Sequence, residues 1–189
     1  MELLKKHILS EGIAITGGII RVDSFLNHQV DPMLIDAMAE EFCCRFTGIK
    51  CDRILTVEAS GIAPAVMTGL KLKVPVVFAK KSRPSTGTGA AYSAKVHSFT
   101  KQKDYEITVS ADYIRQGESI IIIDDFLAHG SASAGLIDIV HQAGAEVTAI
   151  GIVIEKGFQD GGRLLREKGF RVESLAIITG IDGNTIQFR

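Results

Sequence analysis

Short runs of branched apolar residues recur along this chain. Runs of this kind are typical of strands that are buried on both faces of a parallel sheet. They predict strands at residues 53–57, 74–79, 120–123 and 147–154, with two later strands at 171–178 and 185–188. Pro75 lies close to the start of its run, where a strand tolerates proline.

Segments in which apolar residues follow a helical spacing lie between these runs. Asp31-Pro32 is a favourable helix start, because Asp caps free N–H groups and Pro fits the first turn. An apolar stripe follows at every fourth position, and we expect this helix to end near Gly48. Further helices are expected at 3–8, 64–70, 136–140 and 162–168. The alternation of strands and helices predicts an α/β fold, with a central, mainly parallel sheet flanked by helices.

Two segments lack a clear period. Residues 12–22 alternate loosely around Gly17-Gly18, which predicts a strand and a turn. Residues 80–98 are polar and rich in Lys, Ser, Thr and Gly, and we interpret them as a long loop that acts as a lid or a binding loop. The alternative is a solvated excursion between the strands of a hairpin, with residues 99–110 as one arm.

Composition narrows the class of protein. With 189 residues, 46% of them apolar, the chain is long enough for one globular domain with its own core. A formal net charge of −1 argues against a general nucleic-acid binder. The apolar runs are too short for a membrane span, and the N-terminus carries no signal-peptide core. Cys43, Cys44 and Cys51 lack zinc-ligand spacing and fit reduced thiols, which indicates the cytoplasm.

Asp124 and Asp125 end the most apolar strand, and a loop with Gly130 and Ser131 leads into the next helix. Open α/β sheets bind ligands beyond the carboxyl ends of their strands. A helix N-terminus presents free N–H groups that suit phosphate, whereas carboxylates suit hydroxyl groups or a metal ion. This strand, loop and helix therefore offer hydroxyl acceptors beside a phosphate cradle, which fits a ribose 5-phosphate.

A resemblance to a known family rests on residues 120–132. Four apolar residues, two acids and a phosphate loop in this order resemble the signature of the type I phosphoribosyltransferases. Residues 22–29, 60–67 and 151–156 also resemble this family, so the similarity covers nearly the whole chain. It implies a single phosphoribosyltransferase domain over 1–189, in which about residues 1–30 and the C-terminal segment form a small hood over the base.

The resemblance also implies an activity. Members of the family transfer a phosphoribosyl group from phosphoribosyl pyrophosphate (PRPP) to a base, with Mg²⁺ carried by PRPP, and they are commonly homodimers. The Asp-Asp-Phe-Leu-Ala form of the signature is most similar to bacterial members that use xanthine. We therefore expect xanthine and PRPP to give xanthosine 5-monophosphate and pyrophosphate, a step of purine salvage.

Roles for individual positions follow from the same resemblance. It implies that Asp124 and Asp125 are catalytic and grip the ribose hydroxyls. The PRPP-binding residues that it implies are Ala128, His129, Gly130, Ser131, Ala132, Ser60, Gly61 and Lys81. The base-binding residues that it implies are Ile20, Asn27, Phe126 and Lys156. We expect no metal-binding cluster among the histidines. Simpler interpretations stay open for three of these residues: Lys81 as a solvated surface charge, Asn27 as an ordinary turn residue, and Phe126 as part of the core.

Two positions depart from the wider family. Ala132 stands where many members carry Thr, so the loop amides are expected to hold more of the phosphate. Ala128 stands where hypoxanthine-guanine enzymes carry a carboxylate that is proposed to manage a purine proton, and alanine cannot do so. Xanthine ionises more readily than hypoxanthine or guanine, so Ala128 is consistent with xanthine as the base.

Other functions remain as alternatives. The same reaction on guanine or hypoxanthine is the nearest one. A PRPP-sensing transcription regulator on this fold would need a DNA-binding segment, for which the chain has no spare length. A dinucleotide-binding domain is disfavoured because Gly87-Thr88-Gly89 lies outside the strand-to-helix context that such a motif requires.

Overall fold

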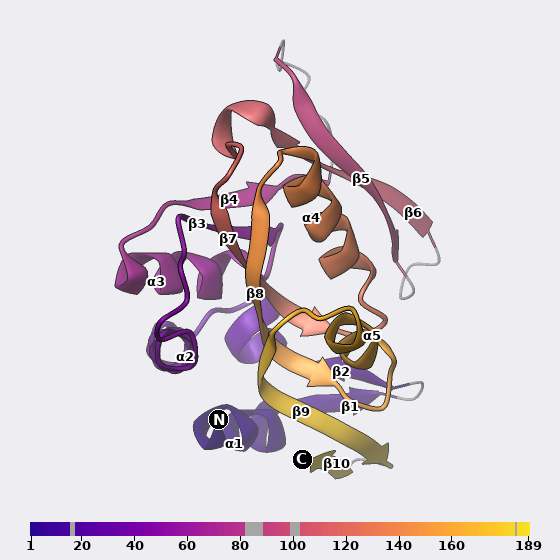
Figure 1. Ribbon diagram of the computed structural model, residues 1–189. Helices are drawn as coiled ribbons and strands as arrows, with labels where there is room; N and C mark the ends of the chain where they lie inside the picture. Colours follow the sequence, from indigo (N-terminus) through magenta and orange to yellow (C-terminus); the bar gives the residue numbers. More distant parts are fainter. Residues whose placement is uncertain (16–17, 82–88, 99–102, 184) are drawn as a thin grey trace.

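The computed structural model describes residues 1–15, 18–81, 89–98, 103–183 and 185–189 (Figure 1). A six-stranded sheet in the order β10-β9-β8-β7-β3-β4 forms its centre. The strands are β3 (Arg53–Val57), β4 (Val76–Ala79), β7 (Ser119–Leu127), β8 (Glu146–Lys156), β9 (Val172–Asp182) and β10 (Thr185–Phe188). Every neighbouring pair is parallel except β9 and β10. The predicted mainly parallel sheet is confirmed.

Helices cover both faces of this sheet (Figure 1). One face carries α1 (Glu2–Glu11), α2 (Pro32–Arg45) and α3 (Ile62–Leu72). The other face carries α4 (Ser131–Gln142) and α5 (Gly161–Glu167). Asp31 caps α2 as expected, since its Oδ1 accepts hydrogen bonds from the N–H groups of Met33 (2.9 Å) and Leu34 (3.2 Å).

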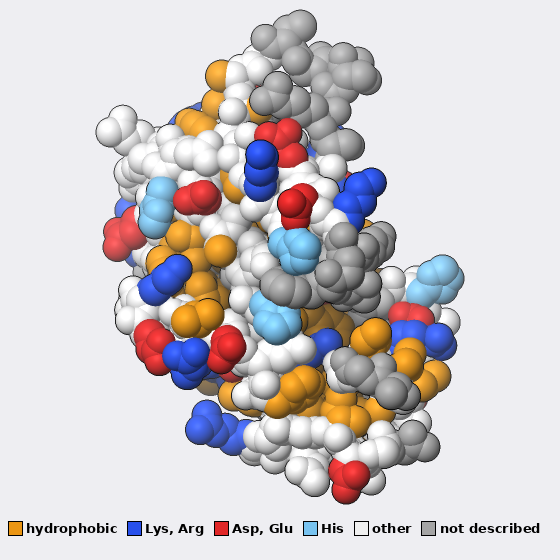
Figure 2. Space-filling view, turned by 90° about the vertical axis from the view of Figure 1, so that its right-hand side faces the viewer, with side chains coloured by type: hydrophobic (Ala, Val, Ile, Leu, Met, Phe, Trp, Pro, Cys, Tyr) orange, Lys and Arg blue, Asp and Glu red, His pale blue; other side chains and the backbone are white. Residues whose placement is uncertain are grey.

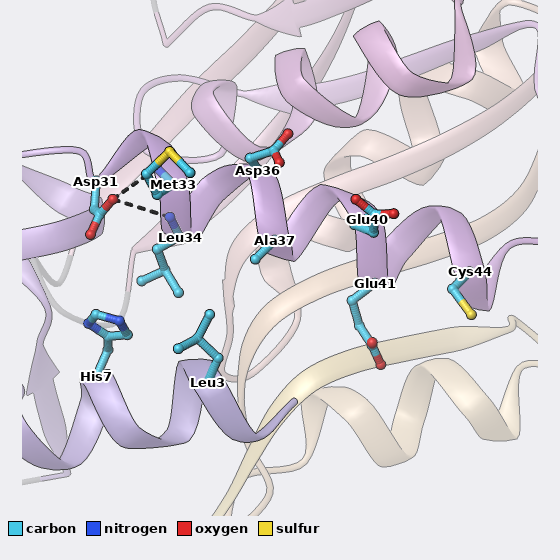
Figure 3. Close-up of a pocket in the computed structure, with 10 residues that line it drawn as sticks. All are labelled: Leu3, His7, Asp31, Met33, Leu34, Asp36, Ala37, Glu40, Glu41 and Cys44. Atoms are coloured by element: carbon cyan, nitrogen blue, oxygen red, sulfur yellow. Dashed lines mark hydrogen bonds between the residues drawn. The ribbon is translucent and has the colours of Figure 1, made fainter.

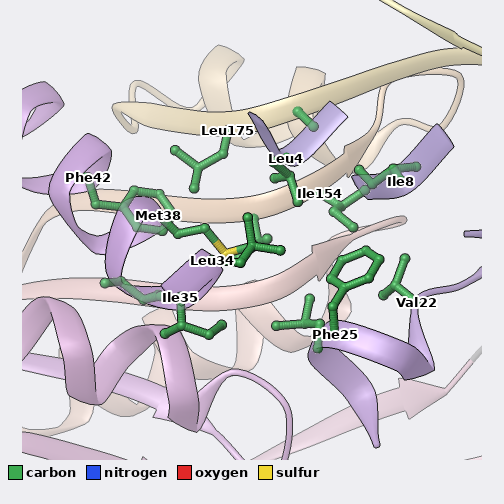
Figure 4. Close-up of a cluster of buried hydrophobic side chains, with 14 of the residues drawn as sticks. Leu4, Ile8, Val22, Phe25, Leu34, Ile35, Met38, Phe42, Ile154 and Leu175 are labelled. Atoms are coloured by element: carbon green, nitrogen blue, oxygen red, sulfur yellow. The ribbon is translucent and has the colours of Figure 1, made fainter. Parts of the chain in front are cut away.

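The strand β7 explains why two apolar layers form. Ile121 and Ile123 lie in the core cluster under α1, α2 and α3, which Figure 4 shows in part. Ile120 and Ile122 lie in a second cluster under α4 and α5. Because successive side chains of a strand point to opposite faces, one continuous apolar run fills both layers.

The segment between β4 and β7 differs from the predicted long loop. Residues 91–98 form β5 (Ala91–Ser98), which pairs antiparallel with β6 (Lys103–Ser110). The expected hairpin arm is therefore confirmed at 103–110, whereas both the loop and the solvated excursion are wrong for 91–98, which is the other strand of the hairpin. Ala94 and Val96 are buried against the α4 side of the sheet, and Lys95 between them is exposed. The polar residues between the apolar ones made this alternating pattern hard to recognise in the sequence. The part of the expected lid at 82–88 lies outside the described residues.

Both ends of the chain lie at the same side of the sheet (Figure 1). The short strands β1 (Ile13–Ile15) and β2 (Ile19–Arg21) pair with each other, and the π-helical turn η1 (Asp23–Asn27) follows them. The Lys5 ammonium donates to the carbonyl oxygen of Arg189 at 3.0 Å, which ties α1 to the C-terminus. Leu4 and Ile8 are fully buried, so α1 belongs to the main core.

Candidate active site

Asp124 and Asp125 lie near the carboxyl end of β7, between β3 and β8 in the sheet. Asp124 is 2% exposed, and its Oδ1 accepts a hydrogen bond from the N–H of Asp125 at 3.0 Å. The Asp125 Oδ1 accepts one from the N–H of Phe126 at 2.9 Å. Asp125 itself is half-buried and is the more accessible of the two.

The electrostatics of this acid pair are unusual. Burial raises the pKa of Asp124 well above its ordinary value, and the negative charge of Asp125 raises it further. The positive charge of Lys81 acts in the opposite direction on the pKa of Asp124. A buried carboxyl group beside a second carboxylate favours a cationic or hydroxyl-bearing ligand, because either relieves the repulsion.

Asn27 joins three segments that are far apart in the sequence. Its Nδ2 donates to the Oδ2 of Asp125 at 3.0 Å and to the Oγ of Ser60 at 3.0 Å. Ser60 belongs to the loop between β3 and α3, and Asn27 closes the turn η1. The structure therefore places Asn27 directly against the acid pair, a contact that the sequence pattern did not indicate.

The loop from Glu58 to Gly61 runs beside the acid pair. Its Glu58–Ala59 peptide bond is cis. A Cβ atom at Gly61 would lie 2.3 Å from the Thr56 Oγ1 and 3.2 Å from the Asp124 Oδ1, so only glycine fits there. The N–H of Lys81 donates to the Oε1 of Glu58 at 2.6 Å. Gly61 therefore lies against Asp124, and the positive charge of Lys81 acts on the same carboxyl group.

The loop 128–132 leads from β7 to α4. Gly130 has φ +83° and directly precedes the first residue of α4, Ser131. The first N–H groups of a helix have no partner within it, so those of Ser131 and Ala132 are available to an anion. Gly161, at the start of α5, supports the loop from behind: its N–H donates to the carbonyl oxygen of Ala128 at 3.0 Å. Sequence reasoning missed Gly161, although Gly161-Gly162 at a helix start was a visible signal.

Lys156 and Phe126 lie together on neighbouring strands. The Lys156 Nζ donates to the carbonyl oxygen of Gly18 at 2.9 Å and lies 5.9 Å from the centroid of the Phe126 ring. Burial lowers the pKa of Lys156. Phe126 is partly buried against the first core cluster, and Ile20 is 6% exposed within it. The structure thus brings Lys156 and Phe126 together, and it places Ile20 mainly in the core.

Next to Lys156 in β8, the buried carboxylate of Glu155 forms an ion pair that anchors α5. The Arg166 guanidinium donates to both carboxylate oxygens of Glu155, at 2.8 and 2.7 Å, and the Ser174 hydroxyl also donates to Glu155. Although burial opposes it, these hydrogen bonds from Arg166 and Ser174 lower the pKa of Glu155. Since α5 also supports the loop 128–132 (the anion loop), the ion pair between Arg166 and Glu155 stabilises this loop indirectly.

A groove of about 770 Å³ lies between α1 and α2 (Figure 3). It is lined by Leu3, His7, Asp31, Met33, Leu34, Asp36, Ala37, Glu40, Glu41 and Cys44. None of the predicted site residues lines it. On the face shown in Figure 2, basic and acidic side chains are interspersed, in keeping with the formal net charge of −1.

Two further observations concern metals and membranes. Within the described ranges, no three His, Cys, Asp or Glu side chains are grouped so that they could hold a metal ion. None of the helices in the same part of the chain combines the length and the apolarity needed to cross a membrane.

The molecule is an open α/β protein that presents an acid pair and a helix N-terminus at the carboxyl edge of its sheet, the place where this class binds its ligands. The particular family follows from comparison. A family model described as "Phosphoribosyl transferase domain" matches residues 22–180, and the chain belongs to this family, with the type I fold.

Full-length relatives narrow the comparison. The chain is 50% identical over 189 residues to xanthine phosphoribosyltransferase of Oceanobacillus iheyensis, covering all of this chain and 97% of the relative. It is 53% identical over 188 residues to the enzyme of the same name from Moorella thermoacetica, covering all of this chain and 96% of the relative.

Solved structures resemble the fold. Adenine phosphoribosyltransferase from Rhodothermus marinus superposes with a TM-score of 0.74 at 20% identity, over 94% of this chain and 97% of that one. The enzyme from Giardia lamblia gives a TM-score of 0.76 at 17% identity, over 92% of this chain and 96% of that one. At these identities the likeness supports the fold.

Proposed function

We propose that this protein transfers the 5-phosphoribosyl group of PRPP to xanthine, giving xanthosine 5-monophosphate and pyrophosphate in purine salvage. The relatives named xanthine phosphoribosyltransferase, at 50–53% identity over the whole chain, support the substrate. The observation that carries the chemistry is the acid pair Asp124–Asp125, which lies at a strand end beside the N-terminus of α4.

The acid pair serves the ribose in this proposal. Asp124 and Asp125 accept hydrogen bonds from the ribose hydroxyls, and the N–H groups from Ala128 to Ala132 hold the 5-phosphate, together with the Ser131 hydroxyl. As the bond at C1 breaks, the sugar gains positive charge. The negative charge of Asp125 then stabilises the transition state more than the ground state.

Pyrophosphate leaves on the side of Ser60, Gly61 and Lys81. Lys81 supplies a mobile point charge, and the amides of residues 59–61 approach the anion closely because these residues are small. Mg²⁺ enters with PRPP as part of the substrate and neutralises the pyrophosphate. The carboxylates of the acid pair, which favour cations and hydroxyl groups, fit this substrate.

The base lies near Lys156 in this proposal. Lys156 exchanges the Gly18 carbonyl for a carbonyl oxygen of xanthine, and the partly buried ring of Phe126 stacks on the purine. Asn27 supplies both a donor and an acceptor, and Ile20 lines the same end of the site. Ala128 provides no carboxylate for a purine proton, which suits a base that ionises readily.

The direct test is product formation from PRPP and Mg²⁺ with xanthine, guanine, hypoxanthine and adenine in parallel assays. A strong preference for xanthine is expected. Preference for guanine or hypoxanthine would discard xanthine as the substrate and keep the PRPP site. PRPP binding without turnover of any base would favour a PRPP sensor, which a salt-sensitive DNA gel shift would then examine.

The proposal also covers the domain organisation, the oligomeric state, the location and the partners of the protein. The chain acts as one domain over 1–189, with a hood formed from about residues 1–30 and the C-terminal segment. It works as a homodimer in the cytoplasm, without nucleic acid or membrane as a partner. Analytical ultracentrifugation at several concentrations tests the dimer, because a monomer would sediment at about half the mass.

A further inference from the structure

Tyr105 contacts Lys81 but has no role in the function proposed above. Tyr105 belongs to β6 in the hairpin, whereas Lys81 lies two residues after the end of β4. The Lys81 Nζ lies 5.5 Å from the centroid of the Tyr105 ring. A cation within about 6 Å of an aromatic centroid is attracted by the ring's negative face. The contact therefore joins a PRPP-site lysine to a side chain of another element.

The Tyr105 ring is itself well supported. It is half-buried and packs against the core cluster under α4. Burial raises the pKa of Tyr105, and the negative charges of Asp124 and Asp125 raise it further, so the phenol lies within electrostatic reach of the acid pair. The hydroxyl has no hydrogen-bond partner among the described residues, and its ring is the part that makes a specific contact.

Lys81 makes contacts at its backbone and at its ammonium group, and a flexible aliphatic side chain connects the two. Its N–H is fixed by the Oε1 of Glu58 at 2.6 Å. Its ammonium acts electrostatically on Asp124 across the site. A lysine side chain has four methylene groups and samples many positions unless something restrains its end. The Tyr105 ring, 5.5 Å from the ammonium, is such a restraint.

We propose that Tyr105 is a positioning residue whose ring holds the Lys81 ammonium where the pyrophosphate of PRPP leaves. This inference rests on the proposed function and deepens it at the pyrophosphate end of the site. Negative charge builds up on the leaving pyrophosphate as the C1 bond breaks. A cation that is already in place stabilises this charge without reorganising at the moment of reaction.

The first experiment compares Tyr105→Leu with Tyr105→Phe. Loss of the ring in Tyr105→Leu should raise the KM for PRPP and the inhibition constant of pyrophosphate roughly two- to fivefold, as expected for a cation–π contact of an exposed lysine. The KM for the base should stay unchanged. Tyr105→Phe keeps the ring and should behave as wild type. Equal effects of Leu and Phe, or an equal change in the KM of both substrates, would overturn the proposal.

Tyr92 offers a matched control. It is the other half-buried tyrosine of the hairpin and packs on the same core cluster. Tyr92→Leu should therefore lower the melting temperature about as much as Tyr105→Leu and leave the PRPP parameters unchanged. If Tyr105→Leu fails to fold, Tyr105→Met replaces it, since methionine fills the space and lacks the ring.

A double-mutant cycle with Lys81→Met decides between positioning and simple packing. In the Lys81→Met background, Tyr105→Leu should have no further effect on Mg²⁺-pyrophosphate binding measured by calorimetry, because the group that it positions is gone. Additive losses would refute the inference. The calorimetric measurement needs no base, so it stays interpretable even if the protein prefers a purine other than xanthine.

Discussion

Asp124 combines a cost in stability with a proposed role in binding the ribose. Its carboxyl group is 2% exposed, and burial together with Asp125 raises its pKa. Between the ordinary carboxyl pKa and this raised value, the native state holds a proton that the unfolded state has released. The stability of the ligand-free protein therefore falls as the pH rises through that window, and above it the native state keeps a buried charge.

Asp124→Asn removes this charge and keeps an oxygen that can accept from the Asp125 N–H. We expect the ligand-free variant to melt higher than wild type at pH 8, by about 2–4 °C for each kcal/mol gained. The difference should vanish below the ordinary carboxyl range, where both proteins carry a neutral group. Turnover should fall. A variant that melts lower than wild type at pH 8 would contradict this explanation.

Lys156 makes a second prediction at the residue scale. Lys156→Met keeps the apolar stem beside Phe126 and removes the donor. Since a hydrogen bond from a charged group contributes about 1.5–3 kcal/mol, the KM for xanthine should rise roughly 10- to 150-fold while that for PRPP changes little. Lys168→Met, at an exposed lysine after α5, is the matched control and should change neither. Equal increases in both constants would argue against a role in base binding.

At the scale of elements, the support of the anion loop by α5 can be tested at one atom. A Cβ on Gly161 would lie 2.4 Å from the Ala128 carbonyl oxygen and 2.7 Å from the Gly130 nitrogen. Gly161→Ala should therefore displace the loop and raise the KM for PRPP at least tenfold, as one lost charge-assisted hydrogen bond would.

The control for this substitution is Gly180→Ala in β9. There the nearest atom to the new Cβ is the Gln187 Oε1 at 3.4 Å, an ordinary contact. Its kinetics should stay close to wild type. If both variants lose PRPP affinity equally, then the effect comes from general destabilisation and α5 has no specific role in shaping the anion loop.

Elements with a strong local pattern could be predicted from the sequence, and the rest could not. The run 120–123 and the Asp31-Pro32 start of α2 carry their signals within a few residues, and both are confirmed. The strand β5 was missed because Lys95 and His97 interrupt the apolar positions and because its burial depends on α4, far along the chain. The local spacing of apolar residues does not predict a strand whose burial depends on tertiary packing.

The candidate site shows the same limit at the scale of the whole molecule. The acid pair and the anion loop lie in one continuous segment, so the sequence could indicate them together. Asn27, Ser60 and Asp125 meet only through the fold, since Asn27 and Asp125 are 98 positions apart in the sequence. The contact between Lys156 and Gly18 spans 138 positions. No spacing rule predicts such contacts, which arise from the order of strands in the sheet.

Because the site joins segments from most of the chain, a ligand that binds there should stabilise the whole molecule. At 100 times its Kd, a ligand that binds only the native state adds about 2.7 kcal/mol. With Mg²⁺-PRPP we expect the melting temperature to rise by about 5–10 °C for a chain of this size. Xanthine alone should give a smaller shift, because Lys156 is still engaged by Gly18 in the free protein. Differential scanning fluorimetry with each ligand measures both shifts, and a larger shift with xanthine alone would mean that the base end of the site is open before PRPP binds.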